Sequence, residues 1–125
     1  GIAQVLEDAG VDLDVVALHV VAAGQLPAQI IYRSLDLVAF HDISPRAPTH
    51  ILVIPVKHIA STREAQAGDA KLIGHMLIAA AQIAQEQKLD RGYRLVINTG
   101  SDGGQSVDHL HIHILGGRQM HWPPG

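Results

Sequence analysis

The 125-residue sequence contains no cysteine. This absence excludes a disulfide framework, thiol catalysis and every zinc site that uses cysteine ligands. A metal ion would therefore need histidine and carboxylate ligands. The absence of cysteine also suits a reducing compartment.

Aromatic residues, positive charge and long apolar runs are scarce as well. One Phe, two Tyr and one Trp are the complete aromatic set, so a pocket for a planar ligand must be mostly aliphatic. The net charge of -3 argues against general nucleic-acid binding, which depends on neutralising phosphates, but it allows a small anionic ligand. The apolar stretch at 15–23 is interrupted by His19 and is far shorter than the roughly 20 residues of a membrane span. We therefore expect no membrane segment.

The length indicates one domain, residues 1–125, with one core that buries roughly two thirds of the unfolded surface. No internal repeat or linker divides it. A long helix is predicted at 68–88, where apolar residues recur at helical spacing and Asp69 lies near the positive N-terminus. Apolar spacing between Val11 and Val21 predicts a shorter helix before Gly24.

Three strands are predicted in the first half of the chain. β-Branched and aromatic residues flank a turn at 34–36, which predicts a hairpin of strands 30–33 and 37–40. A loop with two prolines at 44–48 leads into 49–56. That run is nearly all apolar, so we expect a central strand covered on both faces.

Imidazoles alternate with aliphatic side chains at 109–115. In a β-strand successive side chains point to opposite faces, so His109, His111 and His113 would share one face. The aliphatic residues between them would share the other. The alternative is an amphipathic strand whose polar side faces solvent, but three histidines in strict alternation favour a functional site.

The residues before the histidines favour an anion site. A predicted strand at 93–97 leads into a glycine-rich connection at 98–104, and the pair of strands is a candidate hairpin. Backbone N–H groups of such a loop, with the hydroxyl of Ser106, can donate to a phosphate. Taken alone, the loop is equally well explained as a tight turn.

A neutral imidazole attacks phosphorus with one free nitrogen, while a hydrogen bond at its other nitrogen fixes the tautomer. His111 is flanked on both sides and is the natural nucleophile, which leaves His109 to orient it and His113 to contact phosphate oxygen. The rival chemistry is metal binding by these histidines with His50. Asp108 has the wrong parity to join their face, so we predict no metal site.

The segment 109–115 matches the pattern His-φ-His-φ-His-φ-φ, in which φ is apolar, and so resembles the histidine triad (HIT) superfamily. Further segments resemble its histidine triad nucleotide-binding (Hint) branch, and they lie at 40–45, 47–50, 103–107 and 116–125. The resemblance covers residues 27–125.

The resemblance implies an α+β fold with a five-stranded antiparallel sheet, one long helix and one short helix. It also implies a homodimer with a continuous ten-stranded sheet. Residues 1–26 would be a variable N-terminal segment, and the tail at 116–125 would lie at the dimer interface. The implied location is the cytoplasm, with the nucleus as a second compartment.

The implied activity is that of an adenosine 5′-phosphoramidase, a hydrolase of purine nucleoside phosphoramidates and aminoacyl adenylates that needs no cofactor. The middle histidine attacks the α-phosphorus, the amine leaves, and water cleaves the nucleotidyl-histidine to AMP or GMP. Two alternatives remain open. One is a nucleotide-binding adaptor with weak or no catalysis, and the other is a dinucleoside polyphosphate hydrolase of the same superfamily.

The motifs shared with the family imply functional roles for individual residues of this chain. His111 would be the nucleophile, supported by His109 and His50. The implied phosphate contacts are His113, Asn98 and Ser106, with Ser106 also assisting the leaving group. The implied nucleoside contacts are Asp42 at the ribose hydroxyls, Phe40 and Ile43 at the purine, and Gln105 and Val107 beside the nucleotide. Trp122 would lie on the leaving-group side of the neighbouring subunit.

Each of these residues also has an ordinary structural explanation. Phe40 and Ile43 could be core residues, and Asp42 could cap the following turn. Asn98 could satisfy loop backbone, and Ser106 could be an ordinary turn hydroxyl.

Three positions depart from the Hint pattern. Residues 18–20 are Leu-His-Val where an aromatic-Gly-Lys stretch is usual, so we expect weaker or less selective binding of the base. Asp108 stands where an aromatic residue is usual, and Lys57 is a single lysine where two are common.

Overall fold

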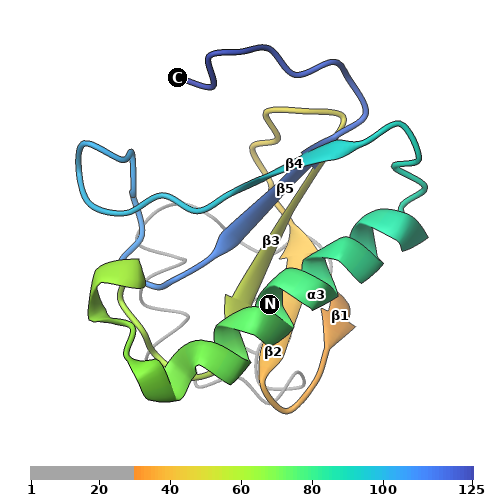
Figure 1. Ribbon diagram of the computed structural model, residues 1–125. Helices are drawn as coiled ribbons and strands as arrows, with labels where there is room; N and C mark the ends of the chain where they lie inside the picture. Colours follow the sequence, from red (N-terminus) through yellow and green to blue (C-terminus); the bar gives the residue numbers. More distant parts are fainter. Residues whose placement is uncertain (1–29) are drawn as a thin grey trace.

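Five antiparallel strands and one long helix make up residues 30–125, the part of the chain that the computed structural model describes (Figure 1). The strand order across the sheet is β1-β2-β3-β5-β4. The elements are β1 (Ile30–Arg33), β2 (Leu37–His41), β3 (Thr49–Pro55), the 3-10 turns η2 (Thr62–Glu64) and η3 (Ala67–Asp69), α3 (Ala70–Glu86), β4 (Tyr93–Val96) and β5 (Ile112–Gly116). The expected α+β class is confirmed, whereas the short helix and residues 18–20 lie outside the described residues.

The first predicted hairpin is present, and the side chain of one serine stabilises its turn. The Ser34 hydroxyl accepts hydrogen bonds from the backbone N–H groups of Asp36 and Leu37, at 3.2 and 3.1 Å. The predicted central strand is also confirmed, because β3 pairs with β2 on one side and β5 on the other. All β3 residues after Thr49 are buried.

Helix α3 covers one face of the sheet (Figure 1). Its inward side is rich in alanine, so the helix can lie close to the strands. The core residues it contributes are Met76, Ala79, Ala80, Ile83 and Ala84. They belong to one cluster with the strand residues Leu37, Ala39, Ile51, Val53, Ile112 and Ile114.

The predicted helix boundaries at 68–88 were too wide at both ends. The α-helix begins at Ala70 because Asp69 ends the preceding 3-10 turn, where its carboxylate accepts the Gln66 N–H at 3.0 Å and the Lys57 ammonium at 2.6 Å. It stops at Glu86 because Lys88 adopts a φ of 60°, which the helix cannot continue. Within residues 30–125, the structure contains no helix with the length and apolar character that crossing a membrane requires.

The predicted histidine strand is wrong at its beginning, because β5 starts only at Ile112. Ile112 pairs with Val53, and the next β3 residue whose backbone faces β5 is Pro55, which has no N–H to extend the ladder. The Leu110 N–H donates instead to the Ile59 carbonyl at 2.7 Å. His109 and His111 therefore precede the strand. The predicted pairing of 93–97 with the histidine strand is confirmed, since β4 lies antiparallel to β5.

Candidate functional site

The candidate site lies on the face of the sheet opposite α3. Cross-strand neighbours point to the same face, and the registers align Phe40 of β2 with Leu52 of β3 and Leu52 with His113 of β5. His50 shares this face because it lies two residues from Leu52. The loop between β2 and β3 closes over the same face and carries Asp42.

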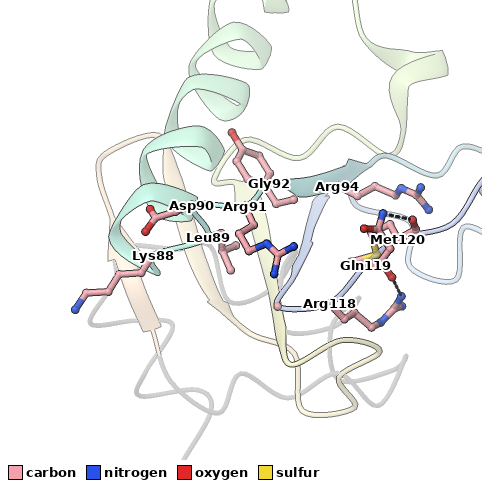
Figure 2. Close-up of a pocket in the computed structure, with 11 residues that line it drawn as sticks. Lys88, Leu89, Asp90, Arg91, Gly92, Arg94, Arg118, Gln119 and Met120 are labelled. Carbon is pink, nitrogen blue, oxygen red and sulfur yellow. Dashed lines mark hydrogen bonds between the residues drawn. The ribbon is translucent and has the colours of Figure 1, made fainter.

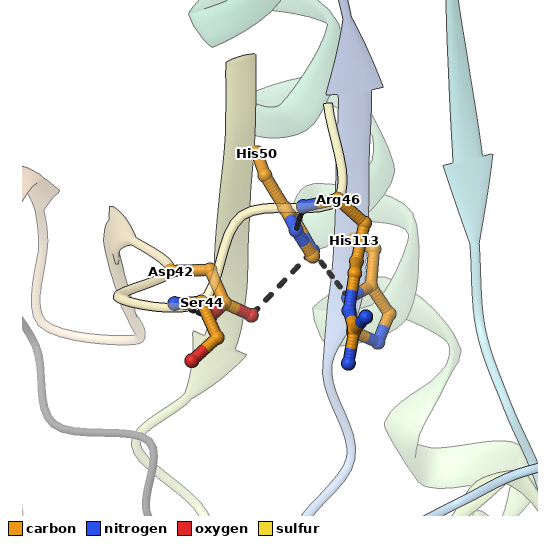
Figure 3. A network of polar contacts seen from close by, with 5 residues as sticks. All are labelled: Asp42, Ser44, Arg46, His50 and His113. Atoms are coloured by element: carbon orange, nitrogen blue, oxygen red, sulfur yellow. Dashed lines mark hydrogen bonds and ion pairs between the residues drawn. The ribbon is translucent and has the colours of Figure 1, made fainter. Parts of the chain in front are cut away.

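A directed chain of hydrogen bonds joins this loop to two histidines (Figure 3). The Arg46 backbone N–H donates to His50 Nδ1 at 3.0 Å, so that nitrogen must accept. In the neutral ring the proton then sits on Nε2, which donates to His113 Nδ1 at 2.9 Å. By the same reasoning His113 carries its own proton on Nε2, where it is a hydrogen-bond donor available to an anion.

His111 has the opposite tautomer. It is 6% exposed, and its Nδ1 lies 2.7 Å from the backbone oxygen of His109. A carbonyl only accepts, so Nδ1 carries the proton and Nε2 keeps a free lone pair in the neutral ring. The His111 and His113 rings meet edge-on, with centroids 4.9 Å apart. A nucleophilic nitrogen thus lies beside a donor.

The ring of His109 belongs to a separate pair. It is 1% exposed, and its Nε2 donates to the Pro55 carbonyl at 2.8 Å. Its Nδ1 then accepts from His58 Nδ1, at 3.1 Å. His109 therefore contacts His111 through its backbone carbonyl. The alternation of side chains in the sequence could not predict this contact. His58 was missed by the sequence analysis, because no periodic pattern connects it with the triad.

Burial holds both histidines of the hydrogen-bond chain in their neutral forms. It lowers the pKa of His113 to about 4, with further lowering from the nearby His111 and His50 and opposition from Asp42. The pKa of His50 is also lowered, mainly by burial and then by Arg46 and His111, against the Asp42 carboxylate. The tautomers assigned above to His50 and His113 are therefore those present near pH 7.

The lowered pKa of His113 predicts a loss of stability in acid. The unfolded chain takes up a proton near pH 6.5, whereas the folded ring resists it until about pH 4. The free energy of unfolding should therefore fall as the pH drops from 6.5 to 4, by on the order of 2 kcal/mol after discounting for partial exposure of the ring. Urea unfolding of wild type and His113→Asn at pH 7 and pH 4.5 measures this. Equal acid losses in the two proteins would contradict it.

Asp42 lies closer to the histidines than the sequence suggested. Its Oδ1 accepts the Ser44 N–H at 2.8 Å, so the ordinary turn-capping explanation is observed. Its Oδ2 lies 3.5 Å from His50 Nε2 (Figure 3). The expectation from Asp108 that no carboxylate shares the histidine face was therefore wrong, because the loop between β2 and β3 brings Asp42 there.

Asp42, His50 and His113 could surround a cation by position, because one ligand atom from each lies within 4.8 Å of the others. The positions of the histidine protons argue against a cation bound there. A metal-bound histidine donates the N–H of its other nitrogen to an acceptor. Here the other nitrogen of His50 faces a backbone donor, the Arg46 N–H. Binding a metal at Nε2 would thus turn two donors toward each other.

The glycine-rich connection is braced by Gln105, although its amide was expected beside the nucleotide. Its Oε1 accepts the Gly100 N–H at 3.0 Å, and its Nε2 donates to the carbonyls of Ala60 and Val107 at 2.7 and 2.9 Å. The side chain is thus engaged in shaping the loop. Gly103 packs so tightly that a Cβ there would come within 2.3 Å of the Thr99 oxygen.

The other candidate residues differ in exposure. Phe40 is 1% exposed, and it lies on the histidine face of the sheet rather than in the cluster packed against α3. Ile43 is 41% exposed and is not a core residue. Ser106 is exposed at the end of the glycine-rich connection, and Asn98 is half-buried after β4. Trp122 is 83% exposed.

Comparisons with known proteins point to one family. Residues 23–120 match the HIT domain family. An uncharacterized HIT-like protein of Synechococcus elongatus is 52% identical over 101 residues, which are 81% of this chain and 89% of that protein. A 14 kDa zinc-binding protein of Zea mays is 46% identical over 103 residues, which are 81% of this chain and 80% of that protein.

Solved structures agree with the sequence matches. A HIT family hydrolase from Legionella pneumophila superposes with a TM-score of 0.79 at 48% identity, over 86% of this chain and 97% of the other. A histidine triad nucleotide-binding protein from Candida albicans superposes with a TM-score of 0.67 at 25% identity, over 86% and 82% of the two chains.

Proposed function

Because this chain belongs to the HIT domain family, we propose that it hydrolyses purine nucleoside phosphoramidates and aminoacyl adenylates through a covalent nucleotidyl-histidine. The observation that carries the proposal is the His111 tautomer. Its Nδ1–H is held by the His109 carbonyl at 2.7 Å, so Nε2 offers a lone pair. The names of the Legionella and Candida proteins support a hydrolase that binds nucleotides.

In the proposed reaction His111 Nε2 attacks the α-phosphorus and the bond from phosphorus to the amine breaks. The amine leaves with a proton, for which the exposed Ser106 hydroxyl is a candidate donor. Water then attacks the nucleotidyl-histidine and releases AMP or GMP. The Nε2–H of His113 would donate to a phosphate oxygen that gains charge in each step, the role of an oxyanion donor. No step of the proposed reaction uses a metal ion.

The nucleoside would extend from the phosphate along the histidine face. Phe40 and the exposed Ile43 would line the purine site, with Asp42 accepting from ribose hydroxyls through the oxygen that the Ser44 N–H leaves free. The other proposed nucleotide contacts are Asn98, Ser106, Val107 and the backbone of Gln105.

We also propose a homodimer with a ten-stranded sheet. β4 is an edge strand, and an open edge is a template for pairing with another chain. Tyr93 of this edge strand is 40% exposed, and Ile78 of α3 is 61% exposed. Pairing of two β4 strands would bring the exposed Trp122 close to the neighbouring subunit. We propose that the dimer works in the cytoplasm and nucleus, where the absence of cysteine suits reducing conditions.

A fluorogenic adenosine 5′-phosphoramidate tests the proposed activity. Wild-type protein should release the amine and AMP, and added chelator should leave the rate unchanged. Diadenosine polyphosphate should be a poor substrate, and faster cleavage of it would favour the dinucleotide hydrolase. Binding of AMP by calorimetry with no turnover of either substrate would favour the nucleotide-binding adaptor and contradict the proposed enzyme.

A further inference from the structure

The beginning of the C-terminal tail is packed against the loop that holds His50. The chain leaves β5 at Gly116, and Gly117 follows with a φ of 89°, a conformation that favours glycine. A Cβ on Gly117 would lie 2.8 Å from the Cβ of Pro48, in the loop between β2 and β3. The tail therefore touches this loop where no side chain fits between them.

The next residue of the tail makes a polar contact with the same loop. Arg118 Nη2 donates to the Arg46 carbonyl at 3.1 Å. Arg118 lines a cavity of about 670 Å³ between the end of α3, β4 and the tail (Figure 2). Arg91 and Arg94 line the same cavity. Within this group the Arg118 side chain is the one that reaches toward the loop.

Arg46 is thus held at both ends of its backbone. Its carbonyl accepts from Arg118, and its N–H donates to His50 Nδ1 at 3.0 Å. His50 in turn donates to His113 Nδ1 at 2.9 Å. A continuous series of hydrogen bonds therefore runs from the tail to the face of the site, and every donor in it points the same way.

We propose that Arg118 is a positioning residue that acts through the Arg46 backbone and keeps His50 and His113 as Nε2–H tautomers. Without the guanidinium, the Arg46 N–H is free to turn away from His50. His50 can then place its proton on Nδ1, and His113 loses the acceptor contact that presents its Nε2–H. Only the catalytic part of this inference rests on the proposed phosphoramidase activity.

The tautomers are measured directly by long-range ¹H–¹⁵N spectra of ¹⁵N-histidine protein near pH 7, without substrate. Wild type should show Nε2–H for His50 and His113. Arg118→Ala should add a second tautomer at both rings, and Arg118→Lys, which retains a donor, should largely restore the wild-type spectrum. Gly117→Ala, which pushes on Pro48, should shift the same two histidines.

Two matched variants control for charge and for the tail. Arg91→Ala removes an arginine from the same cavity. Arg94→Ala removes the contact from Arg94 Nη2 to the His121 carbonyl, 2.7 Å, which holds the tail without touching the loop. Both should keep the wild-type tautomers, and sedimentation of every variant reports any change of oligomeric state. Unchanged spectra in Arg118→Ala, or equal changes in Arg94→Ala, would overturn the proposal.

Activity provides the second readout. Arg118→Ala should lower kcat by roughly three- to tenfold with little change in KM, because the lost donor contact matters most when charge develops on phosphate. Arg118→Lys should recover most of that loss. If wild type turns over no phosphoramidate, the proposed function fails, whereas the tautomer spectra still decide the role of Arg118.

Discussion

Replacing His111 with alanine is expected to lower kcat for an adenosine phosphoramidate by at least about 10⁴-fold, the scale seen when a catalytic nucleophile is removed. The variant loses the only atom on which the nucleotidyl group is proposed to be carried. His109 cannot substitute, because its Nε2 donates to the Pro55 carbonyl and its ring lies against His58. Single-turnover and steady-state assays with equal enzyme concentrations measure the loss.

The His111 variant should still fold and bind AMP, because within residues 30–125 the His111 ring makes one hydrogen bond and the sheet lies behind it. Circular dichroism and calorimetry are the controls. Denaturing the wild-type protein in alkali during turnover, followed by mass spectrometry, should show one added nucleotidyl group on the peptide that contains His111. Turnover by His111→Ala at near wild-type rates would eliminate the covalent mechanism.

Replacing Ile112 with alanine is expected to lower the free energy of unfolding by about 2–5 kcal/mol. Ile112 of β5 is fully buried on the sheet face that α3 covers, in one cluster with Val53 and Ile83. Truncation leaves a cavity that the close-packed helix cannot fill. Because a domain of this size is stable by only about 5–15 kcal/mol, a large part of its stability would be lost.

Urea unfolding at pH 7 measures the effect, with Leu35→Ala as the matched control. Leu35 is 95% exposed in the turn between β1 and β2, so its truncation should change stability by less than about 0.5 kcal/mol. Similar losses for the two variants would contradict the assignment of Ile112 to the core. The Ile112 variant should also lose activity at temperatures where it is partly unfolded.

The strands and the helix could be predicted from the sequence because their signals are local. Short stretches of consecutive residues predict the Ser34 turn, the apolar strand β3 and the helix α3. The structure has all three. The burial of Leu110, Ile112 and Ile114 on the helix side was likewise predictable from alternation. Five antiparallel strands then followed from the family resemblance and are present.

The hydrogen bonds of the site could not be predicted in this way. The Asp42 carboxylate reaches His50 because the loop between β2 and β3 folds back, and sequence parity carries no information about such a loop. The Gln105 amide was available for a ligand in the sequence but is engaged by carbonyls on two segments, one of them 45 residues away. Backbone donors such as the Arg46 N–H have no sequence signal at all.

The early end of the β3 and β5 ladder determines how the ring of His109 is held. Had the strand continued from Ile112 to His109, the Pro55 carbonyl would have accepted the Leu110 N–H across the ladder. Because the Leu110 N–H donates to the Ile59 carbonyl instead, the Pro55 carbonyl is available to accept from His109 Nε2. A residue with no titratable group therefore anchors a histidine of the triad, and a substitution at Pro55 that extended the ladder would remove that anchor while leaving every histidine in the sequence.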